Sequence, residues 1–177
     1  LKSVAWHNSI LRDNTGRIIG TLSVGVDISE RKEAQQVLRE NVQIFRQISE
    51  NVNEMLWVCA PDFSKTYFLS PMYEEIWGRS CQSVYDDPNS WIEGIHPDDR
   101  AAVVNDLEKK ARGDFTSPDF PRCRVIHTDG TMRWIETRAF PVYNEHNQIT
   151  RIAGIVEDIT QRKQEEDAAS IMQQKLE

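Results

Sequence analysis

The sequence predicts an α+β domain with one antiparallel sheet, flanked by amphipathic helices. Two observations predict this class: a strand-to-helix segment occurs twice, and the complete copy runs through two strands, helices and a three-strand meander. Of the 177 residues, 39% are hydrophobic and 28% are charged, so the chain can bury a core and is not disordered in composition. The formal net charge of -7 argues against a nucleic-acid-binding surface, which needs excess basic residues.

The two copies align without a gap at an offset of 131 residues, the separation of Asp27 from Asp158. Residues 13–33 read DNTGRIIGTLSVGVDISERKE, and residues 144–164 read NEHNQITRIAGIVEDITQRKQ. Both run from a polar turn through an apolar strand into Asp-Ile-Ser or Asp-Ile-Thr, and then into a charged helix. The identical pairs are Ile18/Ile149, Asp27/Asp158, Ile28/Ile159, Arg31/Arg162 and Lys32/Lys163. We interpret the first copy, residues 1–29, as a truncated one: a strand hairpin that cannot bury a core of its own.

A long amphipathic helix is predicted over residues 30–52, because this stretch lacks Gly and Pro and its apolar residues recur every three or four positions. We expect its apolar seam to pair with the same helix of a second chain in a parallel dimer, since an exposed stripe is unfavourable in water. The alternative is that the sheet of the following domain covers the seam. The offset carries Phe45 to Leu176, so the outgoing helix keeps the same phase, unless Leu176 and Glu177 are a tag remnant of an excised fragment. The expected dimer seam is Leu38, Phe45, Ile48 and Val52, with Val42 and Met55 in the same stripe.

The complete copy begins with two predicted strands, residues 55–62 and 65–69. Ser70 is placed to cap a short helix that ends at Gly78. A connector over residues 91–97 leads to the next helix.

That next helix has Asp98 and Asp99 in its first turn, where the helix dipole favours anions, and it ends at Gly113. Its predicted buried face consists of Val103, Val104, Leu107 and Ala111.

The last part of the copy is a meander. Residues 122–127 and 131–140 flank Thr128-Asp129-Gly130, a strong hairpin signal. Residues 149–157 form the final strand, and Thr160 is placed to cap the outgoing helix.

Four motifs, in this order and spacing, resemble those of a PAS domain that ends in a PAC motif. They are Phe68-Leu69-Ser70-Pro71-x-Tyr73-x-x-Ile76-Trp77-Gly78, Trp91-x-x-x-Ile95-His96-Pro97-Asp98-Asp99-Arg100, Arg124 with Asp129-Gly130-x-x-Arg133-Trp134-Ile135, and Gly154-Ile155-x-x-Asp158-Ile159-Thr160-x-Arg162-Lys163. The resemblance covers about residues 50–163, and residues 1–32 resemble the tail of a preceding PAS domain. It implies a five-stranded antiparallel sheet in the order 2-1-5-4-3 and helices on one side that enclose a small cavity. It also implies a sensor role in a multidomain signalling protein.

The resemblance therefore divides the chain into four parts. These are the tail of a preceding PAS domain (1–29), a linker helix (30–52), the PAS domain (53–160) and an output helix (161–177). On the 131–140 strand, the period of two places Ile135, Thr137 and Ala139 toward the cavity, and Trp134, Glu136 and Arg138 toward the outer surface. The candidate cavity-lining residues are Trp57, Phe68, Met72, Ile76, Trp91, Val104, Leu107, Val125, Ile135, Thr137 and Ile155.

The Asp-Ile-Thr segment is the candidate signal relay. A carboxylate and a hydroxyl flank one apolar residue where a strand becomes a helix, so Thr160 can bond helix amides, and Asp158 can bond the backbone or Arg162. This arrangement also makes an ordinary helix cap; the resemblance adds that the joint passes strain from sheet to helix. The relay candidates are Asp158, Thr160 and Arg162, with Asp27, Ser29 and Arg31 in the first copy.

No cofactor, metal site or catalytic set is predicted. Cys59, Cys81 and Cys123 are an odd number of widely spaced cysteines, which argues against a disulfide framework or zinc site and fits a reducing compartment. Cys81 faintly resembles the flavin-binding cysteine of light-oxygen-voltage domains, but Ser80 and Gln82 depart from that motif. His96 precedes a helix after Ile95 and before Pro97, which favours a turn residue over a haem ligand.

We therefore expect a non-enzymatic sensory or interaction module from a sensor histidine kinase or a diguanylate cyclase of bacterial type. It would bind an unidentified small ligand or a partner, form a homodimer through its linker helices, and act on the output domain of its parent. The alternative is a ligand-free dimerisation or spacer module, with bulky residues filling the core; a flavin or haem sensor is disfavoured. No apolar run approaches the ~20 residues of a membrane span, so we expect a cytoplasmic module, whatever the membrane attachment of its parent.

Overall fold

The computed structural model describes residues 2–174 of the chain. The chain divides into two compact units, with the boundary between Ile48 and Ser49, inside the long helix α1 (Ser29–Asn51). The predicted seam position Leu176 and the candidate tag residues 176–177 lie outside the described residues. Within residues 2–174, no helix combines the length and the apolar character that crossing a membrane requires.

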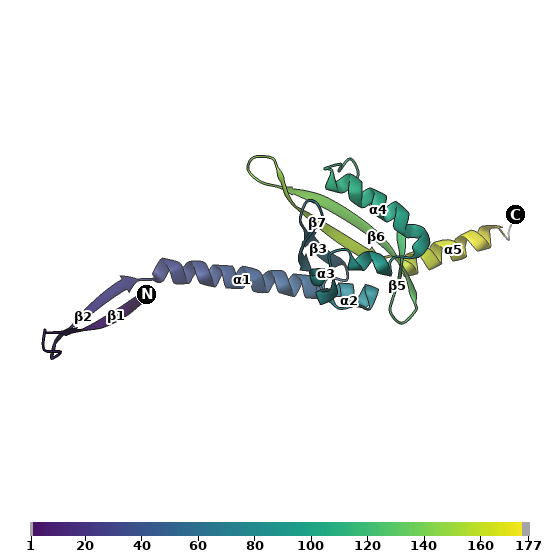
Figure 1. Ribbon diagram of the computed structural model, residues 1–177. Helices are drawn as coiled ribbons and strands as arrows, with labels where there is room; N and C mark the ends of the chain where they lie inside the picture. The colour runs from purple at the N-terminus through teal and green to yellow at the C-terminus, as the bar shows by residue number, and fades with distance from the viewer. Residues whose placement is uncertain (1, 175–177) are drawn as a thin grey trace. The chain divides into compact units, whose positions relative to one another are not determined.

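The first unit contains a two-stranded antiparallel hairpin followed by helix α1 (Figure 1). Its strands are β1 (Val4–Arg12) and β2 (Ile18–Asp27). The Asp13 carboxylate accepts the backbone N–H of Thr15 at 2.8 Å, and Gly16 adopts a φ of 84°, so a short turn can join the strands.

The second unit contains a five-stranded antiparallel sheet. Its strands are β3 (Met55–Cys59), β4 (Thr66–Leu69), β5 (Cys123–Ile126), β6 (Met132–Tyr143) and β7 (Ile149–Asp158). They are arranged in the order β4-β3-β7-β6-β5, which is 2-1-5-4-3 when the strands are numbered from β3. The predicted α+β fold class and sheet order are therefore confirmed.

Helices cover one face of this sheet (Figure 1). They are α2 (Met72–Trp77), α3 (Cys81–Asp86), the 3-10 helix η1 (Ser90–Gly94) and α4 (Pro97–Ala111), and α5 (Thr160–Gln174) follows β7. The sequence had not predicted α3 or η1, because each is a short helix of five or six residues in a polar stretch. The main core lies between helices and sheet and consists of Met55, Leu69, Tyr73, Ile76, Trp77, Val84, Ile95, Val103, Cys123, Val125, Ile135 and Val156.

The start of α2 differs from the prediction. The Ser70 hydroxyl oxygen accepts the backbone N–H of Leu56 at 2.9 Å, so it bonds strand β3, and α2 has no side-chain cap at its first residue. Gly78 ends α2 as predicted, with a φ of 68°. A Cβ at this position would also collide with His127 and Thr128.

The predicted buried face of α4 is wrong at one position: Ala111 is exposed, and Lys110 is buried, with 3% of its surface accessible. The Lys110 Nζ lies 2.9 Å from a carboxylate oxygen of Asp106. It also donates hydrogen bonds to the carbonyls of Ser117 at 3.1 Å and Asp119 at 3.3 Å. A buried ammonium is tolerated here because three oxygen atoms replace its hydration.

Candidate functional site

The second unit encloses a cavity of about 80 Å³ between its helices and its sheet. Five of the predicted lining residues lie on its wall: Trp57, Trp91, Leu107, Ile135 and Thr137. The sequence reasoning missed further wall residues, among them Met55, Cys59, Leu69, Tyr73, Trp77, Val84, Val103, Phe120, Cys123 and Val156. The period of two could have identified some of them, since Met55, Trp57 and Cys59 must share one face of β3.

The other six predicted lining residues do not lie on the wall. Ile76 and Val125 are buried in the core, and Met72 packs against that core from a half-buried position. Val104 is half-buried beside the wall residue Val103 on α4. Phe68 pairs with Val58 across the sheet, and Ile155 pairs with Leu56. Neither of these partners lines the wall, so both residues lie on the opposite face of the sheet.

Two glycines accommodate two tryptophans of the cavity wall. Trp57 pairs with Gly154 across β3 and β7, and a Cβ at Gly154 would collide with the indole. A Cβ at Gly94 would likewise collide with the ring of Trp77, whose Nε1 donates a hydrogen bond of 3.0 Å to the carbonyl of Trp91. The two indoles therefore occupy space that a side chain at either glycine would need.

The cavity wall is electrically neutral: within the described part of the chain, no Asp, Glu, Lys or Arg lines it. Burial raises the pKa of the Cys59 and Cys123 thiols to about 12 each, so both remain protonated at neutral pH. Burial also raises the pKa of the Tyr73 hydroxyl, and the Ser83 side chain beside it partly offsets that rise. These groups offer no ion to a bound molecule.

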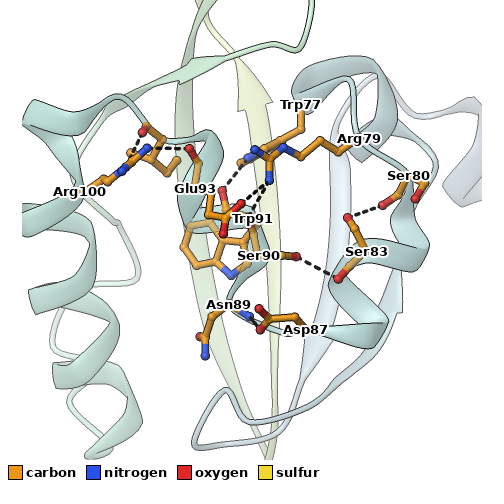
Figure 2. A network of polar contacts seen from close by, with 11 residues as sticks. Trp77, Arg79, Ser80, Ser83, Asp87, Asn89, Ser90, Trp91, Glu93 and Arg100 are labelled. Carbon is orange, nitrogen blue, oxygen red and sulfur yellow. Dashed lines mark hydrogen bonds and ion pairs between the residues drawn. The ribbon is translucent and has the colours of Figure 1, made fainter.

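A polar network holds η1, which contributes Trp91 to the cavity wall (Figure 2). The Arg79 Nη1 donates hydrogen bonds to the Ser90 carbonyl at 3.2 Å and the Glu93 carboxylate at 3.0 Å. From the other side, Arg100 donates to the Glu93 carbonyl at 2.7 Å. Arg79, in the loop between α2 and α3, and Arg100, on α4, thus fix this short helix against the rest of the fold.

The Asp158-Ile159-Thr160 segment joins β7 to α5. The backbone N–H of Trp134 on β6 donates to the Thr160 Oγ1 at 2.9 Å, and the Ile159 N–H donates to the Trp134 carbonyl at 2.8 Å. The Asp158 carboxylate accepts the backbone N–H of Thr160 at 2.9 Å and also bonds the Thr160 hydroxyl and Arg133. The predicted role of Thr160 is corrected, because its hydroxyl bonds the neighbouring strand and not an amide of its own helix. Asp158 bonds the backbone as predicted, at the first amide of the helix.

Arg162 does not pair with Asp158 as the sequence suggested. Its guanidinium lies 2.9 Å from the Glu136 carboxylate on β6 and 3.9 Å from that of Glu157 on β7. Hydrogen bonds from Arg122 and then Arg162 lower the pKa of Glu136. The first turn of α5 is therefore tied to β6 by a charged pair as well as by Thr160.

The outer face of the sheet carries a second connection to α5. The Trp134 ring has Arg124 on β5 and Lys163 on α5 near it, each 5.6 Å from its centroid. Arg124 also donates to both carboxylate oxygens of Asp99 in α4, at 2.8 and 2.6 Å. Contacts thus run from the start of α4 through β5 and β6 to the output helix.

The first copy of the repeat shows the same hydrogen bonds. The Ser29 hydroxyl accepts the backbone N–H of Ser3 at 2.9 Å, and the Asp27 carboxylate accepts the Ser29 N–H at 3.0 Å. The Ile28 N–H donates to the Ser3 carbonyl at 2.9 Å, as Ile159 does to Trp134. Arg31 is exposed in the first turn of α1. The repeat therefore extends from sequence to backbone hydrogen bonding.

Cys81 and His96, which the sequence disfavours as flavin and haem ligands, have local structural roles. The Cys81 Sγ donates to the Ser70 carbonyl at 3.6 Å, and burial, with Glu74 beside it, raises the pKa of this thiol to about 11. The His96 Nδ1 accepts the backbone N–H of Asp98 at 3.3 Å and so caps α4. Among residues 2–174, no cluster of three His, Cys, Asp or Glu side chains could hold a metal ion.

The predicted seam residues lie on α1 and just after it. Leu38, Phe45 and Ile48 are exposed in the single chain, and Val52 is half-buried.

A family model described as PAS fold matches residues 66–156, just over half of the chain. The chain belongs to the PAS family. The match includes strands β4 to β7 and therefore most of the cavity wall, while the hairpin of the first unit lies outside it.

Two solved structures resemble this PAS domain closely enough to support the family. One is a domain of a histidine kinase from Haloarcula marismortui, 32% identical, with a TM-score of 0.53; the match covers 67% of this chain and 99% of that chain. The other is a sensory box histidine kinase/response regulator from Burkholderia thailandensis, 30% identical, with a TM-score of 0.52; the match covers 70% of this chain and 90% of that chain.

Among curated proteins, a methyl sulfide methyltransferase-associated sensor from Methanosarcina acetivorans is 26% identical over 166 residues, which are 89% of this chain and 16% of that protein. The chain spans about a fifth or less of the length of the curated relatives it matches. PAS domains of signalling proteins are thus what this chain is similar to, which supports a sensory module.

Proposed function

We propose that residues 53–160 form a non-enzymatic sensory PAS module that binds a small molecule in its cavity and relays the binding to α5. The observation that carries this proposal is that the same two strands serve both sites. Ile135 and Thr137 on β6 and Val156 on β7 line the cavity. Their neighbours Trp134 and Glu136 on β6 bond to the first turn of α5. A small shift of β6 relative to β7 would therefore move the start of α5.

The relay needs no chemical reaction. Thr160 and Arg162 fix the first turn of α5 to β6, and Asp158 fixes it to the end of β7. If an occupant of the cavity separates these strands or changes their twist, the helix rotates or tilts with them. Helix α5 would then alter the packing of the output domain that follows it in the parent protein.

We propose a sensor histidine kinase as the parent, because two solved structures at least 30% identical to this chain come from histidine kinases. A diguanylate cyclase is the alternative, since PAS modules can be followed by different output domains.

A ligand-free spacer remains the second candidate function, and one observation favours it. The cavity of about 80 Å³ is smaller than the ~300 Å³ at the lower end of usual ligand sites. Native mass spectrometry of the 177-residue chain distinguishes the two functions. A bound small molecule that is released on unfolding supports the sensor, whereas a bare chain that also binds no added small molecule supports the spacer.

We also propose that α1 pairs with its equivalent in a second chain. Leu38, Val42, Phe45 and Ile48 recur at helical spacing, and about half or more of each side chain is accessible in the single chain. Burying these residues against a twin would remove their unfavourable contact with water.

For the first unit, we propose that β1 and β2 are the last strands of another PAS domain. The shared hydrogen bonds at Ser29 and Thr160 support this, and so do the exposed apolar side chains of the hairpin, including Trp6, Leu22 and Val26. Deleting residues 1–29 tests the division, because the second unit has its own core and should retain its cooperative urea transition. Loss of that transition would show that the hairpin belongs to the folded domain.

A further inference from the structure

We propose that the cavity selects a neutral, mainly apolar molecule on the order of three or four heavy atoms, and that it rejects anions and aromatic rings. This inference rests on the proposed sensory function and specifies the class of molecule that would be sensed. It follows from the volume, the charge and the rigidity of the wall.

The volume limits the ligand. An engineered apolar cavity of about 150 Å³ holds benzene or xenon. The cavity of this protein has about 80 Å³, close to half of that, so it has room for a xenon atom or a three- or four-atom organic molecule. A flavin, haem or nucleotide would require the fold to open.

The wall also excludes charge. Its thiols, at Cys59 and Cys123, are neutral because burial raises the pKa of each to about 12. The remaining polar groups of the wall are hydroxyls and the indole N–H groups of its three tryptophans, and none of them carries a charge. An anion would lose its hydration and find no cation, whereas a neutral molecule with one polar group would lose little.

The wall cannot easily enlarge. The Trp57 indole occupies the space above Gly154, and the Trp77 indole occupies the space beside Gly94. Trp77 is also held by its hydrogen bond to the Trp91 carbonyl. Moving these rings would disrupt the strand pair β3–β7 or the η1 helix, so the present volume sets the size limit.

The test uses the methyl NMR signals of Val103, Ile135 and Val156, which line the cavity. Four probes are titrated into the whole 177-residue chain: xenon, acetone, acetate and benzene. Acetone and acetate have the same number of heavy atoms and differ in charge, and benzene is larger. We expect saturable shifts with xenon and acetone, an apparent Kd at least about tenfold weaker for acetate, and no saturation with benzene.

Two phenylalanine variants on one strand locate the binding. Val156→Phe places a ring in the cavity and should abolish the saturable shifts, whereas Ile155→Phe adds the same ring on the opposite face of β7 and should retain them. If Val156→Phe does not fold, Thr137→Leu fills the same space from β6, where Thr137 pairs with Val156. Retention of binding in a folded filled variant would overturn the assignment of the site.

The failures of the two proposals differ. Tight binding of acetate or benzene at the same methyl groups would overturn the ligand class and leave a ligand-binding sensor. If none of the four probes shifts the lining methyl groups, the cavity is not a ligand site and the sensory function fails with it.

Discussion

The backbone N–H of Trp134 donates a hydrogen bond of 2.9 Å to the hydroxyl oxygen of Thr160, and so ties strand β6 to the first residue of helix α5. At an offset of 131 residues, Ser3 and Ser29 make the same bond at the same distance. A hydroxyl is needed at this position because it can accept from the strand while it donates to the preceding Asp. This bond connects the output helix to β6, a strand that does not adjoin it in sequence.

Thr160→Val should destabilise the second unit by about 1–2 kcal/mol, because valine has the same shape and leaves the Trp134 N–H without its acceptor. Thr160→Ser is the matched control, since it keeps the hydroxyl that Ser29 supplies in the first copy. Urea unfolding measures both variants. A loss in Thr160→Ser that exceeds the loss in Thr160→Val would mean that the methyl group, not the hydrogen bond, matters here.

Asp99→Asn should lower stability at pH 7 and by a smaller amount at pH 3.5. Hydrogen bonding from Arg124 is the largest cause that lowers the pKa of Asp99 in the folded chain. The ionised carboxylate therefore stabilises the fold above its unfolded pKa of about 3.9, and this contribution is lost as the pH falls through the lower folded value.

Asp98→Asn is the control for that measurement. Asp98 lies beside Asp99, but its side chain is 74% accessible and its oxygen is 3.5 Å from Arg124, so its removal should change stability little. The urea unfolding midpoints of the wild type and of both variants, measured at both pH values, test this prediction. A deficit for Asp99→Asn that does not shrink at low pH would contradict the assignment.

Lys110→Met should destabilise the second unit by about 2–4 kcal/mol, because it leaves the Asp106 carboxylate and two carbonyls without their cation. Lys109→Met changes the exposed neighbour in the same helix and should stay within about 0.5 kcal/mol of the wild type. Thermal or urea unfolding can compare them. A double variant that adds Asp106→Asn should recover part of the loss, and no recovery would show that the ion pair is not the cause.

Lys110 also shows what sequence periodicity cannot predict. The strands and the hairpin turn followed from the period of two and from turn residues, which are local properties, and the sheet order was expected from the resemblance to PAS domains. The burial of Lys110 depends on the carbonyls of Ser117 and Asp119 in a loop, and their positions are set by the tertiary fold. Loops and caps that exchange partners across the fold leave no comparable pattern in the sequence.

The same limit applies to the site. Alternation along β6 correctly placed Ile135 and Thr137 on the cavity wall, yet Ile155 was assigned to the wrong face of β7. The Asp158 and Thr160 side chains were identified as the joint, but the partner of the Thr160 hydroxyl was not, because Trp134 lies on a strand distant in sequence. The residue types could be predicted from local pattern, and the contacts could not.

Phe45→Glu should weaken self-association of the chain at least about tenfold, because it places two negative charges across the proposed seam. Gln43→Glu is the control: it adds the same charge to the same helix two residues away, on a different face. Analytical ultracentrifugation across micromolar concentrations measures both. A wild-type chain that is monomeric throughout, or a Phe45→Glu variant that associates as well as Gln43→Glu, would exclude this seam as the dimer interface.

The central claim is that an occupant of the cavity changes the bond between β6 and α5. Amide hydrogen exchange of Trp134, with and without saturating xenon, tests it most directly. Ser3 is an internal control, because it makes the equivalent bond in a hairpin that contributes no residue to the wall of this cavity. The account predicts that xenon changes exchange at Trp134 by at least about threefold and leaves Ser3 unchanged. Unchanged exchange at Trp134 while xenon shifts the cavity methyl groups would contradict the relay.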